Sequence, residues 1–179
     1  MAVSVLHWVS DGDHRLMRRV NGWMPPHWMR LWMVAATRGG DGWLWYAMGA
    51  GIAVGGGPER FRALAAAVTA VSVGIALFLV LKRACGRKRP CAVAPHCWAT
   101  LLPPDHFSFP SGHTITAFAV ASSLGVFYPG VLPGLLFCAA SVGLSRIMLG
   151  MHFLSDVLAG AALGTALGYT AAVVFSLIH

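Results

Sequence analysis

Long apolar stretches constrain the fold of this chain more than any other feature of its sequence. Residues 63–81 read ALAAAVTAVSVGIALFLVL, without a charged side chain. A helix needs about 20 such residues to cross the hydrocarbon core of a bilayer. Three further, largely apolar stretches cover 114–128, 131–149 and 153–178. Backbone groups inside lipid have to pair within their own segment, so these stretches predict transmembrane α-helices.

Composition supports the same fold class. Of the 179 residues, 57% are hydrophobic and 11% are charged, whereas soluble domains carry about 25% charged residues. Residues 43–57 form a fifth, shorter apolar stretch. The apolar part of residues 1–16 is too short for a signal peptide, so we expect the spans themselves to direct insertion.

The expected fold is an all-α integral membrane protein with an interfacial helix near its N-terminus. Residues 1–40 mix Arg with Trp and Met, a composition typical of a helix that lies in the membrane interface. Residues 41–179 then form the transmembrane domain, a bundle of five helices. The alternative is a bundle of six with a short crossing near 27–39, against which Arg30 and Arg38 argue.

Three polar stretches lie at the ends of the predicted spans. KRACGRKRP (82–90) follows one span, HFSFPSGH (106–113) precedes the next, and SRIMLGMHFLSD (145–156) joins the last two. If neighbouring spans are antiparallel, all three stretches reach the same face of the membrane. Polar residues with purely structural roles would not be expected to converge in this way, so the pattern predicts a site.

The cations and the helix start in these stretches are suited to binding phosphate. Lys82, Arg89 and Arg146 supply positive charge, and an Arg side chain can hold two oxygens of one phosphate. The backbone N–H groups around Ser111 and Gly112 begin a helix, where an anion is favoured. We assign the remaining cations of the loop to contacts with lipid headgroups: Arg83, Arg87 and Lys88.

Two histidines and an aspartate add reactive groups to the predicted phosphate site. His152 and Asp156 are four residues apart at the start of a helix, so their side chains meet on one face. A carboxylate that accepts one ring N–H leaves the other nitrogen as a nucleophile. His113 comes from a different helix and could protonate a leaving oxygen. A single His–Asp pair is more often structural, but the three cations beside this one favour a catalytic role.

The three motifs together resemble the signature of the type-2 phosphatidic acid phosphatase superfamily, over roughly residues 40–178. The matching pieces are Lys-x6-Arg-Pro from Lys82, PSGH from Pro110, and Ser-Arg-x5-His-x3-Asp from Ser145. The superfamily includes lipid phosphatases, glucose-6-phosphatase and vanadium haloperoxidases. The N-terminal region contributes little to the resemblance.

The resemblance implies a role for each residue of the site. His152 would attack phosphorus and form a phosphohistidine, Asp156 would orient it, and His113 would protonate the leaving group and then activate water. The remaining five would hold the phosphoryl oxygens: Lys82, Arg89, Ser111, Gly112 and Arg146. The chain has six acidic residues, and only Asp105 and Asp156 lie near the motifs in sequence. Two-metal phosphatases need several carboxylates, so we expect no metal and no cofactor.

Two other function classes fit the sequence less well. A vanadate-dependent haloperoxidase would have no need of five lipid-spanning segments. A carrier that only binds lipid headgroups would need the cations but not His113, His152 and Asp156. The expected partners are a phosphorylated membrane lipid and the bilayer itself, with no role for nucleic acid. Undecaprenyl diphosphate is the first choice of substrate, and phosphatidylglycerophosphate, phosphatidate and lipid A are alternatives.

The charge pattern and the resemblance predict opposite orientations in the membrane. Of 13 Lys and Arg residues, only Arg60 and Arg62 lie opposite the predicted site, so the positive-inside rule would place the site in the cytoplasm. The resemblance instead favours the external face of the bacterial inner membrane. A disulfide among Cys85, Cys91 and Cys97 would require an oxidising compartment, and the same spacing beside His96 is unlike that of usual zinc sites.

Overall fold

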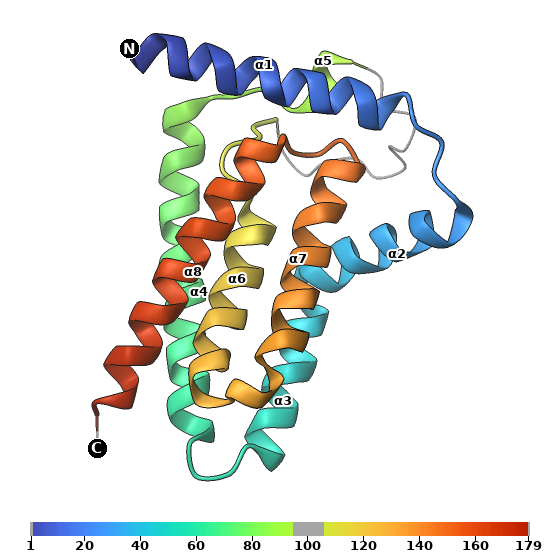
Figure 1. The fold of residues 1–179 in the computed structure, drawn as a ribbon. Coiled ribbons are helices and arrows are strands. Elements are labelled where there is room, and N and C mark those ends of the chain that lie inside the picture. Colours follow the sequence, from blue (N-terminus) through green and yellow to red (C-terminus); the bar gives the residue numbers. More distant parts are fainter. Residues whose placement is uncertain (1, 95–105, 179) are drawn as a thin grey trace.

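The computed structural model describes residues 2–94 and 106–178, and these form a helical bundle (Figure 1). The helices are α1 (Ala2–Asn21), α2 (His27–Arg38), the π-helical turn η1 (Gly39–Trp43), α3 (Leu44–Gly55), α4 (Arg60–Cys85), α5 (Pro90–Val93), α6 (Gly112–Phe127), the 3₁₀ turn η2 (Pro129–Val131), α7 (Leu132–Met148) and α8 (Leu154–Ser176). In the described residues the extended backbone pairs at one isolated bridge, between Lys88 and Phe107. The expected all-α class is confirmed.

Three of the described helical segments are long and apolar enough to cross a bilayer, and they are Arg60–Cys85, Pro129–Met148 and Leu154–Ser176. Helix α6 is also apolar but has 16 residues. Helix α3 is shorter still, at 12 residues, and runs beside α4 in the bundle (Figure 1). These helices correspond to the predicted spans to within a few residues at each end. The number of crossings, five or six, stays a prediction.

Helix α6 occupies the middle of the bundle and packs against α4, α7 and α8. Its contact with α8 is close because α8 presents Gly160, Gly164 and Gly168 to it. A Cβ at Gly160 would lie 2.8 Å from the carbonyl oxygen of Ser111, and one at Gly164 or Gly168 would collide with the α6 backbone. These glycines let two apolar helices approach to backbone contact, as in other membrane proteins.

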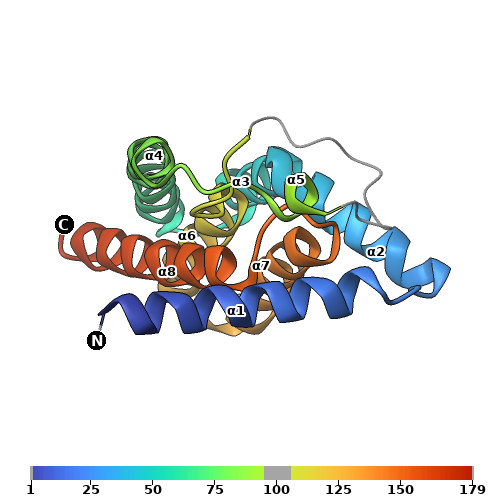
Figure 2. The ribbon, with the colours of Figure 1, turned by 90° about the horizontal axis from the view of Figure 1, so that it is seen from above.

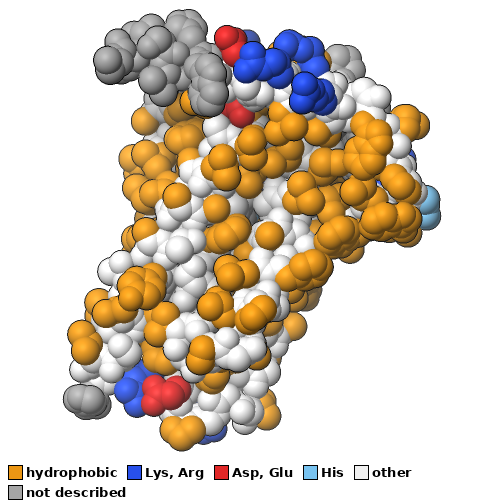
Figure 3. All heavy atoms as spheres, in the orientation of Figure 1, with side chains coloured by type: hydrophobic (Ala, Val, Ile, Leu, Met, Phe, Trp, Pro, Cys, Tyr) orange, Lys and Arg blue, Asp and Glu red, His pale blue; other side chains and the backbone are white. Residues whose placement is uncertain are grey.

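Helix α1 does not join the bundle but lies across its end, where Figure 2 shows it passing over α8 and α7. Its sequence is amphipathic, with Asp13 and Met17 buried and Arg15, Arg18 and Arg19 exposed. Figure 3 shows apolar side chains over the flank of the bundle and charged ones gathered at its two ends. This distribution fits a bundle that spans the apolar layer with α1 at headgroup depth.

Candidate active site

The three motif cations meet at one end of the bundle, although they come from three elements. Lys82 lies in the last turns of α4, Arg89 in the segment after α4, and Arg146 near the end of α7. All three side chains are buried, and they line one cavity together with Gly112, His113 and His152. Buried Lys and Arg side chains are rare unless they have partners. The predicted convergence of the three stretches is confirmed.

Protein groups hold each of these cations in place. The Lys82 ammonium lies 4.5 Å from the centre of the Phe78 ring. Arg89 donates from Nη1 to the carbonyl oxygen of Met151 at 2.8 Å. Arg146 donates from Nη1 to the Thr37 hydroxyl at 2.6 Å. The cluster of positive charge is therefore built into the structure before any anion binds.

The ring of His152 has a defined tautomer. Its Nδ1–H donates to the carbonyl oxygen of Ser108 at 2.6 Å, and its Nε2 accepts from Arg89 Nη1 at 3.2 Å. Nε2 therefore carries a lone pair, and this lone pair faces the cations that are suited to binding phosphate. Burial lowers the pKa of His152 from 6.5 to about 4, and the guanidinium groups of Arg146 and Arg89 act in the same direction, against the opposing influence of Asp156. The ring is neutral at physiological pH.

Asp156 approaches His152 as the spacing predicts, but it is not the hydrogen-bond partner of the ring. The distance from His152 Nδ1 to Asp156 Oδ2 is 3.7 Å. Oδ2 accepts instead from the backbone N–H of Phe153 at 2.8 Å, and Oδ1 accepts from Arg87 Nη1 at 2.7 Å. The carboxylate is drawn to the N-terminus of α8, where unpaired N–H groups favour an acceptor.

Ser111 lies behind the wall of the cavity rather than in it. The residue is fully buried, its backbone N–H donates to the carbonyl oxygen of Asp156 at 3.1 Å, and its hydroxyl accepts from Thr114 at 2.8 Å. In this structure α8 already uses the Ser111 N–H, and the contact between Ser111 and an anion stays a prediction. Gly112 does line the cavity at the first turn of α6.

Arg87 is not the exposed headgroup contact that the sequence analysis assigned. Its side chain is 23% exposed and bonds to Asp156 and to Asp13 of α1, each at 2.7 Å. The guanidinium also lies 4.2 Å from the centre of the Phe153 ring. The assignment failed because Asp13 lies far away in sequence. Arg83 and Lys88 are exposed, as a headgroup contact requires.

His113 has its own carboxylate partner, which the motifs do not include. Its Nε2–H donates to Asp41 Oδ1 at 2.6 Å. Asp41 belongs to η1, which joins α2 to α3, and Gly42 beside it has a φ of 130°, a conformation that favours glycine. Gly40 of the same turn is buried, and a Cβ there would lie 3.4 Å from the His113 ring and 2.9 Å from Val142. Gly40 therefore makes room for the ring.

A cavity of about 1000 Å³ extends from these residues along the bundle, between α3, α4 and α6. Beyond the polar end its walls are mostly apolar, and they include Trp45, Tyr46, Leu64, Val71, Ile75 and Val120. The shape is that of a polar pocket continuous with an apolar chamber. It suits a ligand with an anionic head and a hydrocarbon chain.

Sequence reasoning missed four residues that contact the site: Asp13, Thr37, Asp41 and Ser108. Three of them, Asp13, Thr37 and Asp41, precede the first motif, which begins at Lys82. One indication was available. In a basic, apolar chain with six acidic residues, each acid is expected to have a cationic partner.

The described His, Cys, Asp and Glu side chains form no group of three or more that could hold a metal ion. Cys85 and Cys91 are both thiols. Cys97, His96 and Asp105 lie outside the described residues.

The part of the chain that carries the motifs is similar to known proteins. The family model of the PAP2 superfamily matches residues 63–178, which include all three motifs. A lipid A 1-phosphatase from Rhizobium johnstonii is 35% identical over 54% of this chain and 41% of its own length. The chain thus spans less than half the length of that relative.

Two further relatives extend the comparison beyond the motifs. A decaprenylphosphoryl-5-phosphoribose phosphatase from Mycobacterium tuberculosis is 35% identical over 71% of this chain and 68% of its own length. The crystal structure of a transmembrane PAP2-type phosphatidylglycerolphosphate phosphatase from Bacillus subtilis superimposes with a TM-score of 0.76, over 96% of this chain and 88% of that one. At 24% identity, this likeness concerns the fold alone.

Proposed function

The chain belongs to the PAP2 superfamily, and from that premise we propose that it hydrolyses the phosphomonoester or diphosphate headgroup of a membrane lipid through a phosphohistidine at His152, without a metal. The observation that carries the proposal is the environment of His152. Its Nδ1–H is held by the Ser108 carbonyl, and its Nε2 lone pair faces Arg89 in the cavity. A neutral, fixed imidazole beside three buried cations is suited to nucleophilic attack on a phosphoryl group.

In the first step the phosphoryl oxygens accept hydrogen bonds from Lys82, Arg89 and Arg146. Gly112, at the first turn of α6, also contacts the phosphoryl group. Arg89 then leaves His152 Nε2, whose lone pair attacks phosphorus. A P–N bond forms while the bond from phosphorus to the leaving oxygen breaks, and the leaving group is the lipid alcohol of a monoester or the lipid monophosphate of a diphosphate. The cations stabilise the charge that spreads over the phosphoryl oxygens in the transition state.

His113 completes the first step as an imidazolium, protonated on both ring nitrogens, and gives its Nε2 proton to the leaving oxygen, which requires this N–H to turn from Asp41 towards the substrate. In the second step the neutral His113 removes a proton from water as the water attacks phosphorus. The P–N bond breaks, inorganic phosphate leaves, and His113 is protonated again. General acid–base assistance of this kind contributes about 10²- to 10⁴-fold to the rate.

The apolar chamber supports a lipid substrate whose hydrocarbon chain lies between α3, α4 and α6. Undecaprenyl diphosphate remains the first choice, with phosphatidylglycerophosphate, phosphatidate and lipid A as alternatives. The names of the relatives favour a phosphate carried by lipid A or by decaprenylphosphoryl ribose, so these lipids belong in the same assay. We place the enzyme in the bacterial inner membrane with its site on the external face.

The test is phosphate release by the purified protein in detergent, with a chelator present, from each of these lipids in parallel. Rapid acid or alkaline quenching with ³²P-labelled substrate would look for label on the protein. We expect release from at least one lipid and alkali-stable, acid-labile label on the wild type, and neither in His152→Ala. Release that survives in His152→Ala would show that the nucleophile is wrong.

A carrier that binds lipid headgroups without hydrolysing them is the non-enzymatic alternative. Such a protein would bind the phosphorylated lipid equally well before and after His152→Ala. It would also release no phosphate from any lipid of the panel. Binding measured on the same samples separates the two functions.

A further inference from the structure

We propose that α1 is part of the catalytic apparatus, because Asp13 and Arg87 act as positioning residues for Asp156 and the loop that carries His152. The inference rests on the proposed phosphatase activity. It assigns a function to a helix that lies outside the family match, which begins at residue 63.

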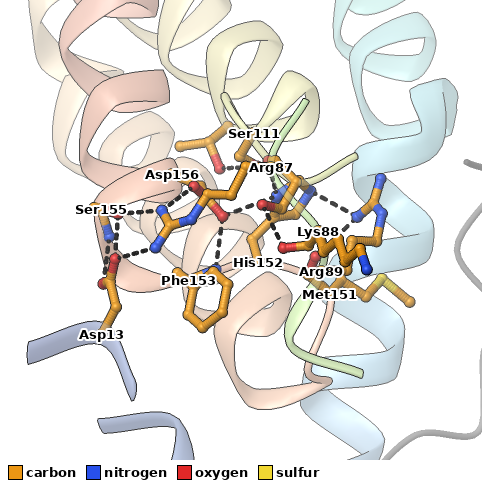
Figure 4. Close-up of polar contacts among 12 residues, drawn as sticks. Asp13, Arg87, Lys88, Arg89, Ser111, Met151, His152, Phe153, Ser155 and Asp156 are labelled. Carbon is orange, nitrogen blue, oxygen red and sulfur yellow. Dashed lines mark hydrogen bonds and ion pairs between the residues drawn. The ribbon is translucent and has the colours of Figure 1, made fainter. Parts of the chain in front are cut away.

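Arg87 joins two carboxylates from distant parts of the chain (Figure 4). Its Nη1 donates to Asp156 Oδ1 and its Nη2 donates to Asp13 Oδ2, both at 2.7 Å. Ser155 lies between them and accepts from Arg87 Nη1 at 2.7 Å, while its own hydroxyl donates to Asp13. The planar fork of a guanidinium can serve both acids at once, which a lysine ammonium cannot reproduce.

Burial makes this network sensitive to the loss of any member. The side chains of Asp13 and Asp156 are 3% and 0% exposed. A buried carboxylate is costly unless a charged partner and hydrogen bonds compensate it. Removing Asp13 leaves Arg87 with one of its two acids, and removing Arg87 leaves both acids without their shared cation. Without Arg87, Asp156 loses one of the contacts that fix its orientation, and without Asp13 the guanidinium that makes this contact loses its second anchor.

Asp13 also caps α8 from outside the helix. The N-cap residue of α8 is Phe153, whose side chain has no acceptor. Asp13 Oδ1 accepts from the Ser155 N–H at 3.0 Å, and Asp156 Oδ2 accepts from the Phe153 N–H at 2.8 Å. Two carboxylates thus satisfy N–H groups that begin the helix. The second of these N–H groups follows His152 directly in the chain, so the position of the His152 ring depends on this cap.

The network stands apart from the groups proposed to bind phosphate. Lys82 packs on the Phe78 ring, Arg89 donates to the Met151 carbonyl, and Arg146 donates to the Thr37 hydroxyl. Losing the network should therefore misplace the nucleophile while leaving the phosphate site able to bind. A lower kcat with an unchanged KM is the result that distinguishes positioning from binding.

The first experiment compares Asp13→Asn with Asp11→Asn, a matched control, because Asp11 is an exposed acid on the same helix. For the lipid that the wild type hydrolyses, we expect kcat of Asp13→Asn to fall about 10- to 100-fold, since small misplacements of a reacting group cost this much. KM should stay within about twofold of the wild type. Asp11→Asn should match the wild type in both constants.

The second experiment uses Arg87→Ala on the folded, monodisperse fraction, so that loss of protein does not mimic loss of rate. Adding guanidinium chloride at low millimolar concentration should restore part of kcat, because the ion can occupy the space between the two acids. Arg87→Lys should remain impaired. Arg83→Ala, an exposed residue just before the same segment, serves as control and should need no rescue.

The outcomes separate this inference from the proposed function. A wild type that releases no phosphate from any lipid overturns both. A wild type that is active, with Asp13→Asn retaining its kcat, overturns only the role of α1. A raised KM with unchanged kcat also overturns it, because the network would then serve binding.

Discussion

The two histidines of the site differ in how the chain surrounds them. The side chain of His152 is 3% exposed and the nearby Asp156 is 0% exposed, whereas His113 is 23% exposed and its partner Asp41 is 55% exposed. His152 is held by a backbone carbonyl and by Arg89, and the loop around it by a network that reaches α1. His113 has one carboxylate partner at the mouth of an apolar chamber.

This difference matches the two tasks of the proposed mechanism. A nucleophile has to be neutral and fixed in direction, and burial beside guanidinium groups provides both conditions. An acid that protonates the leaving oxygen has to remain accessible to the part of the substrate that departs. The buried half of the site, around His152, therefore depends on many partners. The open half, around His113, depends on few. We expect substitutions in the two halves to differ in how much they lower kcat and in whether this loss depends on the substrate.

The largest effect is expected for His152→Asn, which removes the nucleophile. The value of kcat should fall by at least about 10⁴-fold, as for other nucleophiles that form covalent intermediates. The loss should be the same for the lipid and for p-nitrophenyl phosphate, because both need the P–N bond. Steady-state assays with both substrates check this, and a loss confined to the lipid would contradict it.

His113→Asn should produce a smaller and substrate-dependent loss. With a lipid monoester, whose alkoxide is a poor leaving group, we expect kcat to fall about 10²- to 10³-fold. With p-nitrophenyl phosphate the first step needs little protonation, so pre-steady-state release of p-nitrophenol should slow much less. Equal losses in that step for both substrates would argue against His113 as the acid.

Asp41→Asn tests how much the open half depends on its single partner. The amide keeps the size of the side chain but weakens the hydrogen bond that fixes the His113 ring. A decrease in kcat of about tenfold is expected, the size of one lost charge-assisted hydrogen bond. Glu59→Gln is a suitable control, because Glu59 is a half-buried acid at the N-cap of α4, at the opposite end of that helix from Lys82. A variant with wild-type kcat would mean that Asp41 does not support the acid.

The smallest expected effect is a dependence of the protein's stability on pH, caused by the buried His152 ring. Because the pKa of His152 is lowered from 6.5 to about 4, the unfolded chain takes up a proton at a higher pH than the folded one. The contribution of the neutral ring to stability is complete above pH 6.5 and is lost as pH falls towards 4. The melting temperature in detergent should decrease over this range. His152→Asn should flatten the decrease, and an unchanged profile in that variant would contradict the assignment.

The sequence alone determined the class of fold and the centre of the site. Apolar runs in α4, α6, α7 and α8 predicted the helices to within a few residues, since hydropathy is a local property. The spacing of Lys82, Arg89, His113, Arg146 and His152 predicted that these residues meet, and all five line one cavity. Antiparallel neighbours bring the ends of consecutive spans together, so chain order was sufficient for this prediction.

Only the tertiary structure decided which groups hold those residues in place. The bond from Ser155 to Asp13 spans 142 positions of sequence, and the bond from His113 to Asp41 spans 72. No local pattern encodes such pairs, because they depend on how α1 and η1 pack against the end of the bundle. The same packing pairs the Ser111 N–H with the Asp156 carbonyl oxygen of α8. It also places Arg87 in a network with Asp13 and Asp156 instead of at the surface. Motif spacing identified the groups proposed to react with phosphate, and long-range packing selected their supporting partners.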